Sequence, residues 1–524
     1  MYKFHYSTWF LTSLNVVLIP LTNSYIHPDE HYQSLEPLLK FINNGLDEKL
    51  NNGSITWEYS TSSNFPIRSI TILRIYYELL VRKIVSLNPY DIIITIKYYN
   101  LAIFIGAYLL FSNSFMTNRF NYNVSKVLIL SSYTLLSYQV RSFSNSIETV
   151  LLMLFLVFLN SNSFIILGLL FTLGIFNRLT FPLWIILPCA YKAYHIFKKE
   201  TKKKMFVYAI GLLLSLLFAF ISITYMDSFV YFECKRFVLT PLENWMYNSN
   251  PGNLAKHGIH SRMNHFLINF PTLVSPFILI FAALHCGNKI FIKNKLPLLT
   301  CLSGLLFLSL FPHQEARFII PCIPLFYSSL DFEYMKAKYH ASSSITKMLT
   351  KIIILGHAIF SIVMLILMGN LHQSGLINLT NKPAILSNIN NSDFIFWHTL
   401  MPLHWPFYLK IKDRSSLFIH FVEDRARNNG FRELSFETDL KDAHHIFDFM
   451  GVDTNNFVHL INDIKQKKKV DLMSIILVTP SRFTEELKTL DCEYNVVDHF
   501  SYHLNLNDGF DKSPFGLDVL RVIL

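Results

Sequence analysis

The sequence predicts an all-α polytopic membrane protein with about eleven transmembrane helices, followed by a small α/β domain. Hydrophobic residues make up 52% of the 524 residues and charged residues only 16%, and Phe occurs 47 times. This composition is too apolar for a soluble enzyme of that length. From about residue 370 onward the composition becomes that of a soluble domain. We therefore expect a transmembrane module over 1–371 and a soluble domain over 372–524.

The predicted spans are apolar runs that are long enough, with their flanks, to cross a bilayer. The first run is followed by no small-x-small cleavage pattern, so we expect an uncleaved span and not a signal peptide. Between 160 and 200 several runs are short, and re-entrant or broken helices are the alternative there. The spans are expected near 7–23, 92–113, 124–140, 146–160, 164–177, 180–197, 205–224, 266–286, 296–311, 318–330 and 351–369.

The basic residues orient these spans. The net charge of +10 lies in short loops between apolar runs, which is typical of cytoplasmic loops and argues against a nucleic-acid partner. The lysine-rich run 198–204 is expected to be cytoplasmic, and the basic stretch 289–295, two crossings later, falls on the same side. This orientation places the large loops 24–91 and 225–265, and everything after about residue 370, on the opposite side.

Several features suit an endoplasmic reticulum lumen on that opposite side. Sequons at Asn52, Asn378 and Asn390 all fall there, although each is weak evidence by itself. Cys234 and Cys492 are the two cysteines expected to be exposed to it. The spacing of these cysteines neither favours nor excludes a bridge between them.

The first large loop opens with the stretch His27-Pro28-Asp29-Glu30-His31. Pro28 suits the first position of a helix, and Asp29 and Glu30 then fall in the first turn, where exposed backbone amides favour negative charge. One short helix would present both acids at the membrane surface. The simplest interpretation of such a pair is a helix cap without a further role.

Further ionisable residues lie at the boundaries of other predicted spans on the same side of the membrane. Such residues at membrane depth are functional candidates, and ion pairs between helices are their structural alternative. They are Arg141, Glu148, Arg178, Asp227, His313, Glu315 and Arg317.

Later in the first loop, residues 70–84 interleave apolar side chains with Arg74, Glu78 and Arg82. The pattern predicts an amphipathic helix along the membrane, near which a lipid substrate could enter, or a helix packed on the luminal face. In the C-terminal domain the apolar runs 417–422 and 473–478 have strand length, and 481–490 has the pattern of a helix.

Four motifs taken together resemble the glycosyltransferase family 22 mannosyltransferases. They are His27-Pro-Asp-Glu30, Arg141-x-x-Ser-Asn-x-x-Glu148, Arg178-x-Thr-Phe-Pro182 and His313-x-Glu-x-Arg-Phe318, and the resemblance covers roughly residues 1–400. It implies a fold of the GT-C type and a multi-pass protein of the endoplasmic reticulum membrane. It also implies an active site that faces the lumen and a dolichyl phosphate mannose donor.

Within this family, the segments 239–262 and 369–375 resemble the branch that adds the fourth mannose of glycosylphosphatidylinositol (GPI) anchors. Two departures are visible. Ala316 stands where the family pattern has Pro, and Thr399 to His404 replaces a Pro-Pro-Arg type pattern. We therefore assign no function to residues near 400.

The resemblance implies inverting transfer of mannose from the lipid phosphate donor to a glycolipid acceptor, as an α1,2 linkage on its third mannose. Such a displacement needs a base for the acceptor hydroxyl and cations for the leaving phosphate. Asp29 is the expected base, and Glu30 is its orienting neighbour or the alternative base. The residues expected to bind the phosphate are Arg317, His313, Arg141 and Arg178, and those expected to hold the acceptor or support the site are His27, His31, Glu148, Asp227, His257, His260, Arg262 and Glu315.

Two competing interpretations remain. His27 and His31 have the i,i+4 spacing of a metal site, but Pro28 stands where zinc proteases need Glu, so we expect neither a metal nor another cofactor. A lipid or solute transporter would also place polar residues near membrane ends, yet the sequence lacks the repeats common in transporters. Other mannosyltransferases of the family, acting on the third anchor mannose or on N-glycan precursors, are the alternative of the same class.

Overall fold

The structure, a computed structural model, describes residues 2–44, 56–61, 66–250, 252–253, 258, 260–287, 289–411, 417–421, 444–450, 452–468, 474–487, 493–505 and 515–522. The chain separates into two compact units. The first unit comprises Met1–Thr22, Asn64–Tyr76 and Thr95–Ile366. The second unit comprises Asn23–Ser63, Tyr77–Ile94 and Leu367–Leu524, so most of the predicted first loop belongs to the same unit as the C-terminal residues.

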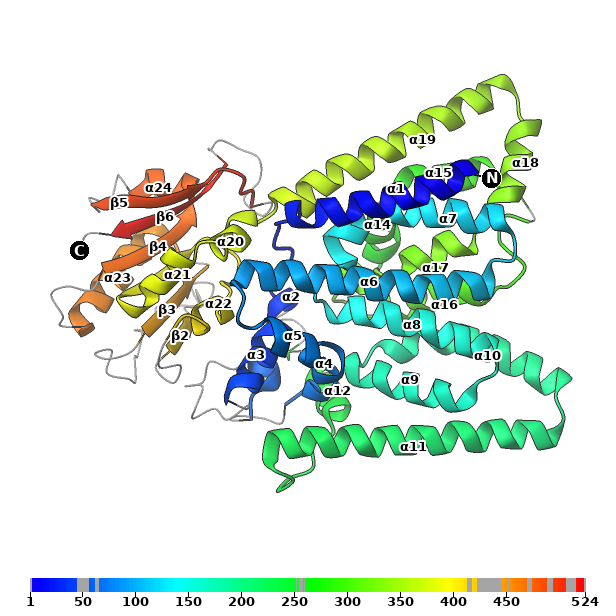
Figure 1. Cartoon of the computed structure of the whole chain (residues 1–524), viewed down its shortest axis with the longest axis horizontal. Coiled ribbons are helices and arrows are strands. Elements are labelled where there is room, and N and C mark those ends of the chain that lie inside the picture. The colour runs from blue at the N-terminus through cyan, green and yellow to red at the C-terminus, as the bar shows by residue number, and fades with distance from the viewer. Residues whose placement is uncertain are drawn as a thin grey trace. The chain divides into compact units, whose positions relative to one another are not determined.

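The first unit is built from helices, because its apolar runs contain few residues that interrupt a helix (Figure 1). Each of the runs predicted as spans overlaps a helix. The helices are α1 (Tyr2–Leu18), α4 (Ile70–Leu73), α6 (Pro89–Phe115, whose first residues belong to the second unit), α7 (Arg119–Ser131), α8 (Ser144–Asn160), α9 (Phe164–Asn177), α10 (Phe181–Lys199), α11 (Lys202–Phe232), α12 (Thr240–Ser249), α14 (Phe270–Val274), α15 (Pro276–Leu284), α16 (Leu296–Leu308), α17 (Cys322–Ser329), α18 (Phe332–Ala341) and α19 (Ser344–Met364).

Three of the described helices are long and apolar enough to cross a membrane: Pro89–Phe115, Lys202–Phe232 and Ser344–Leu371. A fourth candidate is the pair His265–Val274 and Pro276–Leu284, which is bent by 94°. The other predicted spans coincide with shorter helices. The membrane character of the chain is thus supported, whereas the count of about eleven crossings stays a prediction.

Small residues let helices of the first unit approach closely. A side chain at Gly168 of α9 would meet Ser215 of α11, and one at Gly304 of α16 would meet the ring of Trp184 in α10. Figure 1 shows α9 lying between α8 and α11, in agreement with the contacts among these helices. Close packing at small residues is what associates helices in a membrane, where burial of apolar surface supplies no driving force.

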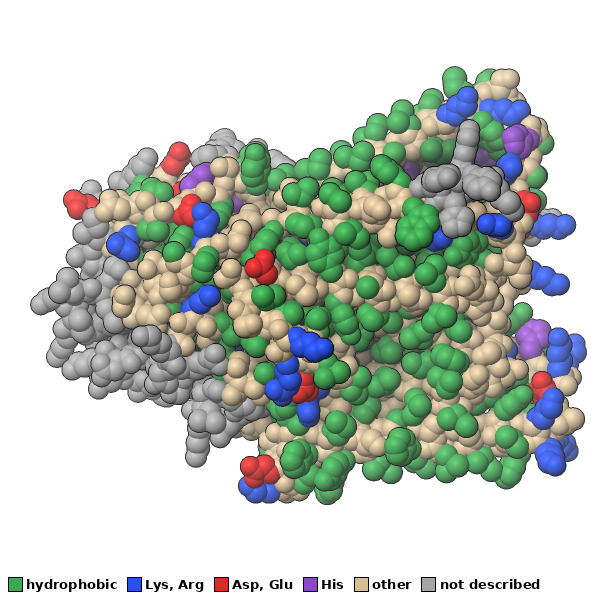
Figure 2. Space-filling view, in the orientation of Figure 1, with side chains coloured by type: hydrophobic (Ala, Val, Ile, Leu, Met, Phe, Trp, Pro, Cys, Tyr) green, Lys and Arg blue, Asp and Glu red, His purple; other side chains and the backbone are tan. Residues whose placement is uncertain are grey.

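The surface of the first unit separates apolar and basic side chains. On α11, Phe218 and Ile221 are exposed over 71% and 64% of their area. Figure 2 shows hydrophobic side chains along this helix, and basic side chains gathered where α10 passes into α11, at Lys198 to Lys204. Such clustering of Lys at one end of apolar helices is what the positive-inside pattern predicts.

The second unit contains a six-stranded mixed sheet with the strand order β2-β3-β1-β4-β6-β5. Strands β2, β3, β1 and β4 run parallel to one another, and β6 is antiparallel to both β4 and β5. The predicted runs 417–422 and 473–478 are found as β2 and β4, and the predicted helix as α24. The strands are β1 (Ser392–Trp397), β2 (Leu417–Phe421), β3 (His444–Phe449), β4 (Ser474–Pro480), β5 (Tyr494–Phe500) and β6 (Leu517–Val522).

Aromatic side chains fill the core between the sheet and its helices. Trp397 of β1 stacks on Phe457 with ring centroids 4.1 Å apart, and its indole N–H donates to the carbonyl of Val452 at 2.8 Å. A buried Trp needs such a partner for its polar N–H. The described helices of this unit are α2 (Asp29–Tyr32), α3 (Leu35–Asn44), α5 (Leu79–Ile84), α20 (Ser374–Leu379), α21 (Pro383–Ser387), α22 (Trp405–Tyr408), α23 (Thr454–Lys468) and α24 (Ser481–Leu487).

A turn that precedes α20 ties the start of the predicted first loop into the second unit. The amides of Ser24 and Tyr25 donate to the carbonyls of Gly369 and His372 at 3.2 and 2.9 Å. On the other side, the amide of Leu504 donates to the carbonyl of Leu371 at 3.0 Å. The chain immediately before α2 is thus fixed by backbone hydrogen bonds to residues far along the sequence.

Candidate active site

The predicted acidic stretch forms the short helix α2 in the second unit. The helix begins at Asp29, one residue later than predicted, because Pro28 is its N-cap residue. The carbonyl of His27 accepts the Glu30 amide at 3.0 Å, which closes the first turn. Asp29 and Glu30 both lie in that turn, as expected, where their charge is favourable.

Asp29 is the more accessible of the two acids. Its side chain is 23% exposed, and it accepts a 2.7 Å hydrogen bond from the amide of Gln33. The same amide nitrogen donates to Glu58 at 3.3 Å, so Gln33 joins two carboxylates. His27 also lies close to this carboxylate, with its Nδ1 atom 3.7 Å from an Asp29 carboxylate oxygen. Two neighbouring side chains thus orient Asp29, and sequence reasoning missed Gln33 and Glu58.

Glu30 and His31 are buried, with side-chain exposures of 2% and 1% and a separation of 3.8 Å. His31 lies between aromatic rings, at 5.6 Å from Tyr25 and 6.3 Å from Trp405. Burial and the nearby acids Glu30 and Asp29 raise the pKa of Tyr25 well above its usual range. Tyr25 therefore stays neutral beside the acids at any working pH.

A buried polar network fixes α2 and α3 to the segment before α22. The Tyr32 hydroxyl donates to the Pro402 carbonyl at 2.6 Å, and a ring nitrogen of His404 lies 3.1 Å from it. Glu36 accepts the backbone amide of Trp405 at 3.0 Å. Burial lowers the pKa of His404 well below its usual range, so the imidazole is neutral. Sequence analysis assigned no role near residue 400, and this network is structural.

In the first unit, Arg178 and Arg317 lie on the same aromatic ring. Each guanidinium carbon is 5.1 Å from the centroid of Phe318, within the range of a cation–π contact. Each arginine also pairs with an acid: Arg178 with Glu148 at 3.3 Å, and Arg317 with Glu315. Four of the predicted residues are thus brought together around a ring for which sequence analysis gave no role.

Arg141 belongs to the same region of the first unit. Its side chain is 1% exposed, and its Nε atom donates to the carbonyl of Ser137 at 2.7 Å. Phe143, two residues further on, lies 5.9 Å from the guanidinium of Arg317. This arrangement places nearly buried guanidinium groups in one region, two of them against the ring of Phe318, where their charge is poorly screened.

The histidines of two other predicted stretches come together nearby. His313 lies 2.7 Å from Glu315 and 5.3 Å, ring to ring, from Phe318. Its ring is 5.8 Å from that of His260, and Gln314 donates to the backbone carbonyl of Arg262 at 3.1 Å. The predicted residue His257 lies outside the described residues.

Asp227 has a structural environment. Its side chain is fully buried and accepts hydrogen bonds from Ser69 at 3.0 Å, from both the amide and the hydroxyl of Thr71, and from Thr240 at 3.3 Å. It therefore joins α11 to α4 and α12. Of the two alternatives left open for Asp227, these contacts favour the structural one.

The predicted amphipathic segment is helical from Ile70 to Ile84, and Arg74–Glu78 within it is a π-helical turn. Ile72 and Leu73 are buried, whereas Ile75 and Leu79 are exposed over 58% and 80% of their area. One face is thus packed and one is not, as either expected arrangement requires.

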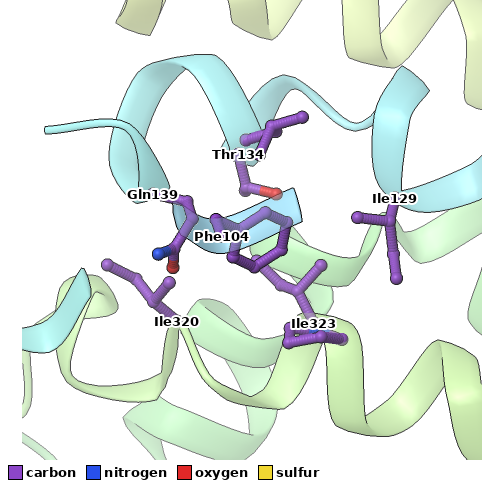
Figure 3. A pocket seen from close by; sticks show the side chains of 8 residues that line it. Phe104, Ile129, Thr134, Gln139, Ile320 and Ile323 are labelled. Atoms are coloured by element: carbon purple, nitrogen blue, oxygen red, sulfur yellow. The ribbon is translucent and has the colours of Figure 1, made fainter. Parts of the chain in front are cut away.

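A small apolar pocket lies elsewhere in the first unit. It is lined by residues that include Phe104, Thr134, Gln139 and Ile320, whose side chains Figure 3 draws as sticks. Its volume of about 10 Å³ suits about one water molecule. None of the predicted site residues lines it. Among the described residues, no three His, Cys, Asp or Glu side chains form a group that could hold a metal ion.

The comparison with known proteins decides the family. Residues 6–397 match the Alg9-like mannosyltransferase family, which is three quarters of the chain. The chain belongs to this family. The enzyme is thus a mannosyltransferase, and the family predicted from the four motifs is confirmed.

Relatives align with this mannosyltransferase from end to end. It is 32% identical to GPI mannosyltransferase 4 of Saccharomyces cerevisiae, with 97% of each chain covered. It is 30% identical to the protein of the same name from Candida albicans, with 99% of each covered. Among solved structures it is similar to ArnT from Cupriavidus metallidurans bound to undecaprenyl phosphate, at 12% identity and a TM-score of 0.48, with 98% of this chain and 97% of that one covered.

Proposed function

We propose that this enzyme transfers mannose from dolichyl phosphate mannose to the third mannose of a GPI-anchor precursor. The observation that carries the proposal is the end-to-end similarity to proteins named GPI mannosyltransferase 4. The new linkage is α1,2, and the reaction takes place in the lumen of the endoplasmic reticulum. The sequons and the orientation of the basic loops support that location.

The proposed reaction is a single inverting displacement. The acceptor hydroxyl oxygen forms a bond to the anomeric carbon of the donor mannose, while the bond from that carbon to the phosphate oxygen breaks. The hydroxyl proton passes to a carboxylate, and the electron pair of the broken bond leaves with dolichyl phosphate. The enzyme therefore needs a base for the proton and positive charge for the phosphate.

Asp29 is the proposed base. Its exposure of 23%, against 2% for Glu30, supports this choice because a base must reach the acceptor hydroxyl. Gln33 and His27 hold the carboxylate in one orientation. Glu30 then acts as a buried neighbour that keeps α2 in place with His31.

Arg178 and Arg317 are proposed to bind the donor phosphate, together with Arg141 and His313. Guanidinium groups remain charged at any working pH and match phosphate oxygens in pairs. Glu148 and Glu315 orient the two arginines. His260, Arg262 and His257 are proposed to hold acceptor groups.

The variant Asp29→Asn tests the proposal in microsomes supplied with labelled donor and a three-mannose acceptor. The amide keeps the oxygen that accepts from Gln33, so the protein should fold while transfer is lost. Glu233→Gln is the matched control, since Glu233 is an exposed acid that forms a surface ion pair with Lys235, and the variant should transfer mannose normally. Near-normal transfer by Asp29→Asn would remove Asp29 from the mechanism.

The acceptor is tested by the lipids that accumulate when the enzyme is depleted. An accumulating anchor precursor with three mannoses supports the proposal, whereas a truncated dolichol-linked glycan would assign the enzyme to N-glycan assembly. Transfer by purified protein in detergent would exclude transport as the activity, because transport needs a sealed membrane.

A further inference from the structure

The ring of Phe318 contacts two arginine side chains of the first unit. The guanidinium carbon of Arg178, which follows α9, lies 5.1 Å from the ring centroid of Phe318. The guanidinium carbon of Arg317, the preceding residue in the chain, lies at the same distance. The two arginine side chains are only 9% and 6% exposed. Two like charges that are both withheld from water repel each other more strongly than they would in solvent.

The ring and the two acids offset this repulsion in different ways. Glu148 pairs with Arg178 and Glu315 pairs with Arg317, so an acid lies beside each arginine. The negative face of an aromatic ring attracts cations without adding a formal charge. Phe318 contacts both guanidinium groups and attracts each of them.

We propose that Phe318 is a positioning residue that holds Arg178 and Arg317 as a pair for the leaving phosphate of the donor. This inference rests on the proposed function, because it takes the phosphate as the anion. A carboxylate in place of the ring would cancel the positive charge that the phosphate needs. An aliphatic side chain would fill the space but would exert no attraction on either cation.

The charge of the phosphate changes during the reaction, and this makes the proposal testable. The phosphodiester of the donor carries one negative charge, whereas the product phosphomonoester carries about 1.5 to 2 at neutral pH. A pair of correctly spaced cations therefore binds dolichyl phosphate more strongly than it binds the donor. Loss of the spacing should weaken binding of the product more than binding of the donor.

The experiment compares Phe318→Leu with the wild type, using purified full-length protein in detergent. Inhibition by dolichyl phosphate should weaken about tenfold or more in Phe318→Leu, with a smaller rise in the KM for dolichyl phosphate mannose and a lower kcat. Phe318→Tyr keeps a π face and should restore product inhibition. Phe164→Leu is the matched control, since Phe164 is a part-exposed ring of the same unit that stacks on Tyr208, and it should leave the kinetics unchanged.

The outcomes separate this inference from the proposed function. If the wild type transfers no mannose from dolichyl phosphate mannose, the proposed function fails. If the wild type is active and Phe318→Leu keeps both its product inhibition and its kcat, Phe318 has no positioning role. Equal losses of donor and product binding in both Phe318→Leu and Phe318→Tyr would show a packing role and would also overturn the inference.

Discussion

Glu36 and Lys40 form an ion pair of 3.0 Å in which neither side chain has any exposed area. Burial lowers the pKa of Lys40, while the adjacent Glu36 carboxylate raises it. Burying the two charges carries an unfavourable desolvation free energy, which their mutual attraction offsets. Removing either partner would leave the other charge buried alone.

The variant Lys40→Met should therefore destabilise the protein by about 3–5 kcal/mol, since it leaves the Glu36 carboxylate buried without its cation. Thermal unfolding in detergent checks this. The double variant Glu36→Gln/Lys40→Met is the control and should recover most of the loss, because the amide oxygen can still accept from Trp405. A double variant no more stable than Lys40→Met would refute the account.

Gln33 is expected to orient Asp29. The variant Gln33→Leu should lower kcat by about tenfold with little change in folding, because Asp29 loses a charge-assisted hydrogen bond worth about 1.5–3 kcal/mol. Steady-state kinetics with the labelled donor measure this. Glu58→Gln, which keeps an oxygen for the same amide, should stay close to wild type, and an unchanged kcat in Gln33→Leu would contradict the prediction.

Asp227 is expected to matter for stability and not for chemistry. The variant Asp227→Leu should lower the free energy of unfolding by about 3 kcal/mol or more, because it leaves the buried donors of Ser69 and Thr71 unsatisfied. Asp227→Asn keeps one accepting oxygen and should lose less. The kcat of the folded fraction should be unchanged in Asp227→Asn, and a kcat that is lost without loss of stability would return Asp227 to the active site.

Asp448 should make the second unit sensitive to pH. Burial raises its pKa from an ordinary value of 3.8 to about 7, although the amide of Met450 partly opposes this. The folded state therefore holds the proton more tightly than the unfolded state, and stability falls as pH rises from about 4 to about 7. Asp448→Asn removes this loss and should raise stability at pH 7.5 by up to about 4 kcal/mol. Unfolding measured at pH 5 and 7.5 tests it, since a variant as pH-sensitive as the wild type would exclude Asp448 as the cause.

The sequence predicted much of the fold because its signals are local. An apolar run of helix length implies a helix whatever it packs against, and 164–177 coincides with α9 to the residue. β1 was missed because all six of its residues are buried, so no alternation marks Ser392–Trp397 as a strand. Domain membership is not local, and the predicted division at 371 differs from the compact units for that reason.

The candidate site shows the same limit. The ionisable candidate residues could be predicted from the sequence, because charged side chains at the ends of membrane spans are unusual. Their partners could not, because the contact between Glu36 and Trp405 spans 369 residues and leaves no pattern in either segment. Phe318 and Gln33 are common residue types whose role depends on which side chains they touch.

The backbone contacts around His372 determine when, during synthesis of the chain, the segment before α2 can adopt its structure. Tyr25, four residues before the proposed base, is hydrogen-bonded to His372, and His372 forms an isolated parallel β-bridge with Leu504. A ribosome adding about 5–20 residues per second needs about 25–100 s to travel from one end of this arrangement to the other. Until His372 has been made, the nascent chain carries its acids without the backbone partner of Tyr25, and until Leu504 has been made the segment around His372 lacks its own partner. The proposed base geometry is therefore completed long after the acids themselves are synthesised.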